Sequence, residues 1–333
     1  MLTAAGLQQK QASGIRRVKL GQDLGAIADL IERCFSPRLD AGGRATIREM
    51  RALSHLGPLL GLLALADTML KGIEQGFVWE EAGQIVGNVT LYPADYPPEL
   101  GRTIIVANVA VDPDHRRRGI ARRLMEAALE ATRAGGAARV ILQVEADNAP
   151  AVKLYEGLGF HIQRTWHHWR RNGELPGPER PRQTAQIGPR PAGRWKEEYA
   201  LAALAFPQER GGLGWQRPLH PREFRRSAAR QTVDFLSGTL VARWVAQEGG
   251  QIVGALWARA GLTSASTQLT LIVHPARRGS LEGALLSHGM WQLAGGYRPL
   301  SAEHPADDQA ATEAFQRYGF TSRRTLHYMA LEF

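Results

Sequence analysis

The 333-residue sequence contains one cysteine, Cys34, and no long uninterrupted apolar run. One cysteine cannot form a disulfide within the chain, and residues 1–14 lack the apolar core of a secretory signal. The most apolar stretch, residues 56–70, is too short to cross a bilayer and is interrupted by Pro58 and Asp67. We therefore expect a cytoplasmic protein without a membrane partner, and we interpret this stretch as a buried helix.

The chain is also poor in lysine, so arginine carries nearly all of its positive charge. The formal net charge of +9 raises the affinity for anions such as nucleic acid or a phosphate-bearing cofactor. The net charge does not specify which anion binds. A GC-rich genome would produce the same arginine content without any functional basic surface. No DNA- or RNA-binding motif is present, and we do not expect nucleic acid as a partner.

Three sequence blocks occur twice in the same order, which indicates a tandem duplication. The first pair shares the letters GQIVG, the second contains a strand followed by a basic turn, and the third ends in Gly-Phe. The blocks are residues 83–93 with 250–260, 109–125 with 273–286, and 148–160 with 307–320. A length of about two common domains fits two separate cores.

The segment 172–181, rich in proline and glycine, has the composition of an exposed connector. We therefore predict a flexible N-terminus at 1–13, a first repeat at 14–171, a linker at 172–181 and a second repeat at 182–333.

Hydrophobic periodicity predicts strands and helices in both repeats, which makes each an α/β domain of the layered α+β kind. In the first repeat the expected strands are 15–20, 77–81, 85–92, 103–111, 138–145 and two more up to Arg171. The expected helices there are 22–34, 44–75, 119–134 and 149–158. In the second repeat we expect helices at 195–206, 223–235, 281–293 and 309–318.

The most informative pattern is a strand that ends at Asp112, a basic turn, and a helix that begins at Gly119. The N-terminus of a helix exposes unpaired backbone N–H groups, and its dipole favours negative charge. A small residue at Gly119 and at Ala121 would let phosphate oxygens approach these amides. The turn is therefore predicted to bind a pyrophosphate, with the nearby arginines as counter-charges. It is neither a Walker loop nor a GxGxxG turn.

At these residues the sequence resembles the GNAT superfamily of N-acetyltransferases. The signature of that family is an Arg or Gln, two residues, Gly, one residue and then Gly or Ala, which matches Arg116, Gly119 and Ala121. The segment 148–160 resembles the family's Asn-x-x-Ala-x-x-x-Tyr helix. The resemblance covers nearly all of the first repeat and implies a splayed central sheet that holds acetyl-CoA.

The resemblance also implies cofactor contacts at three places. Strand backbone at Val109, Ala110 and Val111 would pair with the acetyl group and pantetheine, and a backbone N–H there would polarise the thioester carbonyl. Asn148 and Ala151 would lie along the cofactor. The residues of the pyrophosphate turn would be Arg116, Arg117, Arg118, Gly119, Ile120, Ala121 and Arg122.

Two catalytic roles are implied for side chains of the first repeat. Tyr155 matches the family's tyrosine that protonates the departing thiolate; packing against the sheet is the alternative interpretation. The glutamates that many relatives use as general base are absent, since their positions here are Ile105 and Gln143. Glu145 is the nearest candidate, with Glu80 and His115 behind it, and an acceptor that is already neutral would need no base.

The second repeat departs from the family pattern at its turn and at its tyrosine. The segment between its proline and Gly279 is two residues shorter, Leu281 takes the place of Ala121, and Phe315 takes the place of Tyr155. A leucine there is expected to obstruct a phosphate, and phenylalanine has no proton to give. We therefore expect this repeat to have lost catalysis, with altered acyl-CoA binding as the alternative.

These residues predict an N-acetyltransferase that acts on a primary amine through its first repeat. The acceptor, a small-molecule amine or a protein N-terminus, stays open. The alternative is a non-catalytic module that binds acyl-CoA or nucleic acid. No metal is expected, because the adjacent His167 and His168 would point to opposite faces of a strand. The chain would be a monomer with internal pseudo-symmetry or a homodimer.

Overall fold

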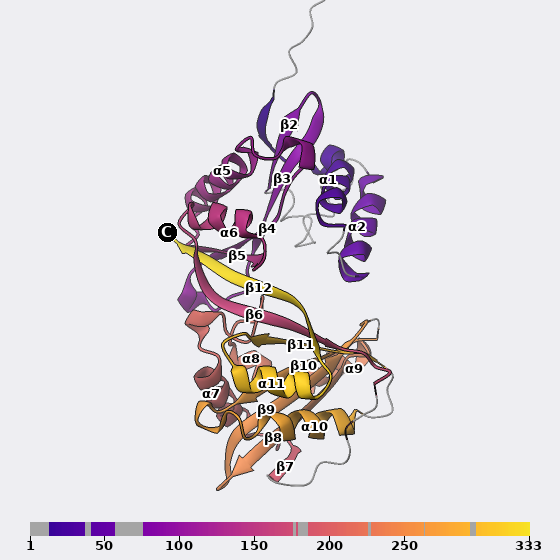
Figure 1. Cartoon of the computed structure of the whole chain (residues 1–333), viewed down its shortest axis with the longest axis vertical. Helices are drawn as coiled ribbons and strands as arrows, with labels where there is room; N and C mark the ends of the chain where they lie inside the picture. Colours follow the sequence, from indigo (N-terminus) through magenta and orange to yellow (C-terminus); the bar gives the residue numbers. More distant parts are fainter. Residues whose placement is uncertain are drawn as a thin grey trace, which may run out of the picture. The chain divides into compact units, whose positions relative to one another are not determined.

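The structure is a computed structural model. It describes residues 13–36, 41–56, 76–175, 178, 186–225, 228–262, 264–293 and 298–333, and for residues 41, 42 and 228–231 only the backbone. The chain divides into two compact units, Met1–Leu142 with Leu331–Phe333 and Gln143–Ala330. We call them unit 1 and unit 2 and describe each by itself (Figure 1). Most of the apolar stretch 56–70 lies outside the described residues.

Unit 1 is a sheet with helices on both faces (Figure 1). Its strand order is β1-β2-β3-β4-β5, antiparallel except for the parallel pair β4 and β5. The strands are β1 (Gly14–Arg17), β2 (Phe77–Glu81), β3 (Gln84–Pro93), β4 (Thr103–Val111) and β5 (Arg139–Glu145), whose last three residues belong to unit 2. The helices are α1 (Leu20–Phe35), α2 (Ala41–Ser54) and α5 (Ile120–Ala134), with short 3-10 turns at Pro98–Leu100 and Pro113–His115.

The middle of β4 carries a β-bulge, which interrupts its pairing with β3. Asn88 lies opposite Ala110 but Thr90 lies opposite Ala107, so β4 has one extra residue. Asn108 within it has φ +52°, a left-handed conformation that is uncommon for residues other than glycine. On the other side, the described ladder with β5 covers only Thr103–Ile105 against Arg139–Ile141, and β4 runs on to Val111. The splayed strands expected from the sequence are therefore present.

Unit 2 is a second mixed sheet, ordered β12-β6-β11-β10-β9-β8-β7. Its strands are β6 (His161–Arg171), β7 (Gln186–Pro189), β8 (Leu240–Glu248), β9 (Gln251–Ala260), β10 (Thr267–Val273), β11 (Leu300–Pro305) and β12 (Thr321–Glu332), of which residues 331–332 belong to unit 1. Its helices are α6 (Ala149–Glu156), α7 (Trp195–Ala205), α8 (Pro221–Phe224), α9 (Ala228–Leu236), α10 (Glu282–Gln292) and α11 (Gln309–Arg317), and 3-10 turns occur at Gln208–Arg210 and Pro275–Arg277.

Successive side chains of a strand point to opposite faces of the sheet, so the strands of unit 2 contribute to two apolar clusters, one on each face. Leu256 and Ala258 of β9 face α10 and α11, which Figure 1 shows in front of these strands. Ala255 and Trp257 face α7 and α8 on the other side. Trp166 of β6 is fully buried and stacks on Tyr328, with ring centroids 5.2 Å apart. The predicted mixed α/β fold class, with a mixed sheet flanked by helices, is confirmed.

Strand β6 belongs to the first repeat by sequence but lies between β11 and β12 in the sheet of unit 2. The compact units therefore divide at Leu142, whereas the sequence repeats were placed to divide at 172–181. The physical reason is that backbone pairing, rather than position along the chain, decides which strands form a unit.

Several elements differ from those predicted. Two final strands were expected before Arg171, but residues 161–171 contain no glycine or proline and form one strand. The helix expected at 223–235 is two helices, α8 and α9. None of the described helices has both the length and the apolar character needed to span a membrane.

Candidate active site

The turn before α5 is held by hydrogen bonds to one carboxylate. The side chain of Asp112 accepts from the Asp114 N–H (3.1 Å) and lies 3.3 Å from His115 Nδ1. Arg33 of α1 forms an ion pair with the same side chain at 3.2 Å. Asp112 therefore fixes the direction in which the chain leaves β4.

Two residues of the turn have left-handed backbone conformations: Arg117 with φ +60° and Gly119 with φ +77°. A Cβ at Gly119 would meet no protein atom within 4 Å. Protein packing thus leaves the space above Gly119 open, and the backbone angle alone favours glycine there. Arg117 has no such freedom, and a strained residue of this kind is common at ligand sites.

The first amides of α5 are available to a ligand. In the described part of the chain, the N–H groups of Gly119, Ile120, Ala121 and Arg122 donate to no acceptor, although the Gly119 carbonyl accepts from Arg123 N–H at 3.1 Å. Four such donors at a helix N-terminus form an anion site. This is the pattern that the sequence predicted for a pyrophosphate.

The four arginines of the turn are not equivalent. Arg118 is bound to both oxygens of Glu81 (3.0 and 2.9 Å), and Arg122 pairs with Glu126 at 3.7 Å. Arg116 Nε donates to the Val111 carbonyl at 3.2 Å, and neither it nor Arg117 forms an ion pair with a described carboxylate. Arg116 and Arg117 are therefore the counter-charges available to an anion.

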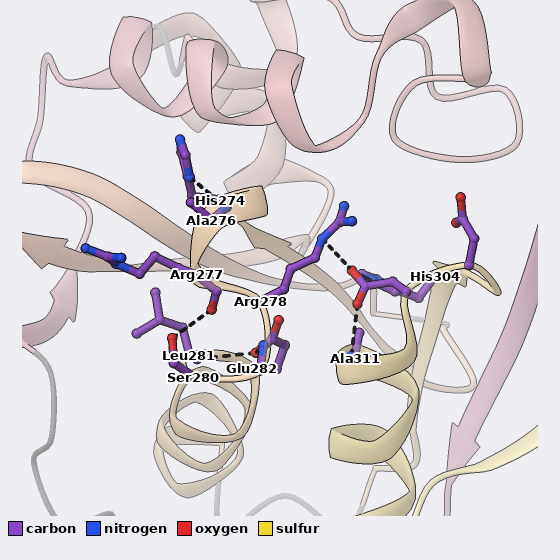
Figure 2. A network of polar contacts seen from close by, with 12 residues as sticks. His274, Ala276, Arg277, Arg278, Ser280, Leu281, Glu282, His304 and Ala311 are labelled. Carbon is purple, nitrogen blue, oxygen red and sulfur yellow. Dashed lines mark hydrogen bonds and ion pairs between the residues drawn. The ribbon is translucent and has the colours of Figure 1, made fainter.

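The corresponding turn of unit 2 is closed by its own side chain. Glu282, the third residue after Gly279, accepts from the Gly279 N–H (2.9 Å) and the Leu281 N–H (3.2 Å) through Oε2 (Figure 2). Its side chain is almost fully buried. Burial, with the charge of Asp308, raises the pKa of Glu282 more than the hydrogen bonds from the amides lower it. A carboxylate therefore occupies the donors that Gly119 and its neighbours leave open.

The arginines of this second turn are paired as well, and Figure 2 shows the pair that Arg278 forms. Arg277 Nε lies 2.7 Å from Glu248, and Arg278 Nε lies 3.3 Å from Asp308. Leu281 was expected to obstruct a phosphate, but its side chain is buried in the core beside α10. The finding that separates the two turns is the carboxylate of Glu282, which the sequence analysis did not consider.

The bulge of β4 carries a polar cluster that the sequence analysis missed. Asn88 Nδ2 donates to Thr90 Oγ1 (3.2 Å) and to the Asn108 carbonyl (3.0 Å), while the buried Asn88 Oδ1 has no partner among the described residues. Burial raises the pKa of the nearby Tyr92 to about 12. The cluster lies beside Val109, Ala110 and Val111, and a buried amide oxygen without a partner can accept from an amine. The only sequence signal was two asparagines in otherwise apolar strands.

Tyr155 lies on α6 and is buried, with its ring edge-on to Phe160 at 6.0 Å. Burial raises its pKa to about 12, so the phenol stays protonated at neutral pH. Asn148 caps the same helix, since its Oδ1 accepts from Ala151 N–H at 3.3 Å. Asn148 and Ala151 thus have a structural role that is independent of any cofactor.

The candidate bases are all paired. Glu145 Oε1 lies 2.8 Å from Arg324 Nε, Glu80 is bound by Arg16, and His115 by Asp112. The described residues contain no group of three potential metal ligands. Residues 109–122 belong to unit 1, whereas Glu145, Asn148, Ala151 and Tyr155 belong to unit 2.

Comparison with known proteins gives a family match in the first repeat. Residues 45–160 match the Acetyltransferase (GNAT) family. The ribosomal protein bS18-alanine N-acetyltransferase of Escherichia coli is 46% identical over 63 residues, which are 18% of this chain and 43% of that protein. A mycothiol acetyltransferase of Saccharopolyspora erythraea is 33% identical over 150 residues, 44% of this chain and 43% of that protein. The matches thus cover less than half the length of these relatives.

Solved structures extend the likeness to the whole chain. A GCN5-related N-acetyltransferase of Sphaerobacter thermophilus aligns over 96% of this chain and 95% of its own, with a TM-score of 0.61 and 18% identity. A tandem GNAT protein from the clavulanic acid biosynthesis pathway aligns over 96% of this chain and 98% of its own, with a TM-score of 0.54 and 16% identity. At these identities the likeness shows the fold.

Proposed function

We propose, from the premise that the chain is a tandem member of the GNAT acetyltransferase family, that it transfers the acetyl group of acetyl-CoA to a primary amine. The first repeat would bind the cosubstrate and the second repeat would not. The observation that supports this assignment is a difference between the two turns. The backbone N–H groups of residues 119–122 donate to no described acceptor, whereas the Gly279 N–H donates to Glu282. Arg116 and Arg117 would add counter-charge to the same phosphates.

The proposed reaction forms a C–N bond and breaks the thioester C–S bond. The amine must first lose a proton, and the departing sulfur must gain one. Tyr155 is proposed to give the proton to sulfur because it matches the family's tyrosine. Burial raises its pKa, which makes the phenol a weaker acid, so the proton would move as the C–S bond breaks. A backbone N–H of Val109 or Val111 would polarise the carbonyl, as an oxyanion-hole donor does.

Glu145 is proposed as the base that takes the proton of the amine. Its Oε1 lies 2.8 Å from Arg324 Nε, so Glu145 would have to exchange this ion pair for a hydrogen bond to the amine. The exchange Glu145→Gln is expected to lower kcat/KM about 100-fold and to remove the acidic limb of its pH profile. A profile with both limbs unchanged would exclude Glu145 and favour an acceptor that binds as the neutral amine.

The acceptor is proposed to be a small-molecule amine or a protein N-terminus. The relatives include a ribosomal protein bS18-alanine N-acetyltransferase and a mycothiol acetyltransferase, which supports both kinds of acceptor. Acetylation assays against a panel of amines and N-terminal peptides would distinguish them. If acetyl-CoA is consumed with none of the amines and none of the peptides of the panel, the competing proposal is favoured, a module that binds acyl-CoA without catalysis.

Isothermal titration with acetyl-CoA tests where the cosubstrate binds. Gly119→Val is expected to weaken binding about 100-fold, or about 2.8 kcal/mol, because valine resists the left-handed backbone and its side chain fills the open space. Gly279→Val is the matched control, since Gly279 has φ +86° and equally open surroundings. It is expected to leave the affinity unchanged. Equal losses in both variants, or no heat with the wild type, would refute the assignment.

A further inference from the structure

One face of the unit 2 sheet changes from apolar to polar along three adjacent strands. Near α7 this face carries Val245, Ala255 and Ile272, all buried in one core cluster. Further along, the same face carries Arg243 and Val241 of β8, Trp257 and Arg259 of β9, and Gln268 and Thr270 of β10. These residues are direct cross-strand neighbours: Trp257 lies opposite Arg243 and Thr270, and Arg259 lies opposite Val241 and Gln268. A polar floor of this kind is not needed to pack a helix.

A cavity of about 260 Å³ lies over this floor. The segment 216–225 and Asp234 of α9 form its other walls. The volume is close to the lower end of the range for small-molecule sites, about 300 Å³. All of these residues belong to unit 2, and none belongs to the turn of the first repeat.

Arg217 provides the charge at this cavity. Its Nη1 donates to Thr270 Oγ1 at 3.1 Å, and it forms no ion pair with a carboxylate of the described residues. Burial lowers the pKa of Arg217 more than the distant charges of Glu303 and Glu223 raise it. Arg217 is half-buried. A partly desolvated cation without an ion-pair partner is costly to a fold, and it becomes favourable when an anion binds.

Two more arginines line the cavity without a described carboxylate partner. Arg225 and Arg259 are exposed and form no ion pair with any described residue. The lining also includes the acidic residues Glu223 and Asp234. Arg217, Arg225 and Arg259 therefore leave the cavity with an excess of available positive charge.

The wall beside Arg217 is rigid. Arg243 lies over the Trp257 ring at 4.0 Å and donates to Glu198 Oε2 (3.4 Å) and to the Phe224 carbonyl (3.3 Å). Trp257 Nε1 donates to the other oxygen of Glu198 at 2.6 Å. Arg243 is thus paired with a fully buried glutamate that Arg190 also contacts at 3.1 Å, and the indole is fixed in place. A site whose walls are held in this way binds without rearrangement.

We propose that this cavity of unit 2 binds a small molecule that carries a carboxylate or a phosphate group. Arg217 in the wall beside Thr270 binds the anionic group, and Arg225 and Arg259 add charge at the opening. Both anionic groups accept hydrogen bonds from a guanidinium in the same forked geometry. The site gives the second repeat a binding role although its own turn is closed by Glu282.

Isothermal titration of the full chain with malonate and, separately, with inorganic phosphate tests the proposal. The Gly119→Val background is used for both, so that anions at the first turn are not counted. One equivalent of at least one probe is expected to bind, and affinity should fall as salt rises. Binding of malonate alone assigns a carboxylate ligand, and binding of phosphate alone a phosphate ligand.

Two variants identify the site. Arg217→Gln is expected to weaken binding at least tenfold, and Arg259→Gln, an exposed position that should not disturb folding, about threefold. Arg323→Gln, an exposed arginine of β12, is the control and should bind as before. No binding of either probe, or equal affinity in the Arg217→Gln, Arg259→Gln and control chains, would overturn the proposal. Titration of the wild-type chain with acetyl-CoA is a separate experiment. Its result tests the proposed function and does not depend on whether the cavity binds malonate or phosphate.

Discussion

The two turns of this chain differ most at the third residue after the glycine. That residue is Arg122 in the first repeat and Glu282 in the second. A glutamate there reaches back to the amides of its own helix, as in a capping box, and closes the anion site. An arginine cannot accept these hydrogen bonds, so the amides stay available. The comparison teaches that one side chain can decide whether a helix N-terminus caps itself or binds a ligand.

The largest effect on activity is expected when Tyr155 of the first repeat is replaced by phenylalanine, the residue that the second repeat has at the matching position 315. Tyr155→Phe removes the proposed proton donor and should lower kcat about 1000-fold while acetyl-CoA affinity changes little. Steady-state kinetics and titration measure the two quantities. The reverse change, Phe315→Tyr, is the control and should give no second activity, because Phe315 is fully buried against Trp169. Unchanged kcat in Tyr155→Phe would leave Tyr155 as a packing residue.

A smaller effect, on acetyl-CoA affinity, is expected when the first repeat receives a glutamate at the position that matches Glu282. Arg122→Glu puts a carboxylate where unit 2 has Glu282, and the glutamate should bind the amides of Gly119 and Ala121. Acetyl-CoA affinity is then expected to fall about 30-fold, or about 2 kcal/mol, by titration. Arg122→Met removes the charge without adding an acceptor for the amides and should cost less than half of this free energy. Equal losses in the two variants would mean that charge alone, rather than closure of the amides, causes the effect.

The smallest effect concerns the pH dependence of stability. Because burial raises the pKa of Glu282 above its model-compound value of 4.5, the folded chain holds this proton more tightly than the unfolded chain does. The contribution of Glu282 to stability is therefore full below pH 4.5 and declines as the pH rises through the folded pKa. Glu282→Gln has no such decline. Urea unfolding at pH 4 and pH 7 should show Glu282→Gln gaining stability relative to wild type at the higher pH; a constant difference would contradict the raised pKa.

The sequence predicted the parts of the site that depend on local chain geometry. A strand, a basic turn and a glycine before a helix predict backbone amides at a helix N-terminus, and the structure has open amides at residues 119–122. That the second turn is closed depends on the side chain of Glu282. The bulge at Asn108 could not be predicted, because it depends on the register between β3 and β4. The ion pair of Glu145 with Arg324 was equally inaccessible, since it joins residues 179 apart.

The fold was predicted in class but not in the pairing of its strands. Periodicity identifies a strand by its own residues, and β6 alternates like any other. Which strands lie beside it is a matter of backbone hydrogen bonds between distant segments. The polar floor under Arg217 illustrates the same point, since Arg243, Arg259 and Thr270 become neighbours only through the sheet.

The position of β6 has a consequence for how the chain is made. Thr165 of β6 bonds to His327 of β12, 162 residues later, so on the ribosome this strand is synthesised long before either of its neighbours exists. Until then its edges have no partners, and pairing over such a distance is slow. A fragment cut at residues 172–181 would keep β6 and lose both flanking strands, so protein produced from either half of the gene is expected to aggregate rather than to yield a working domain.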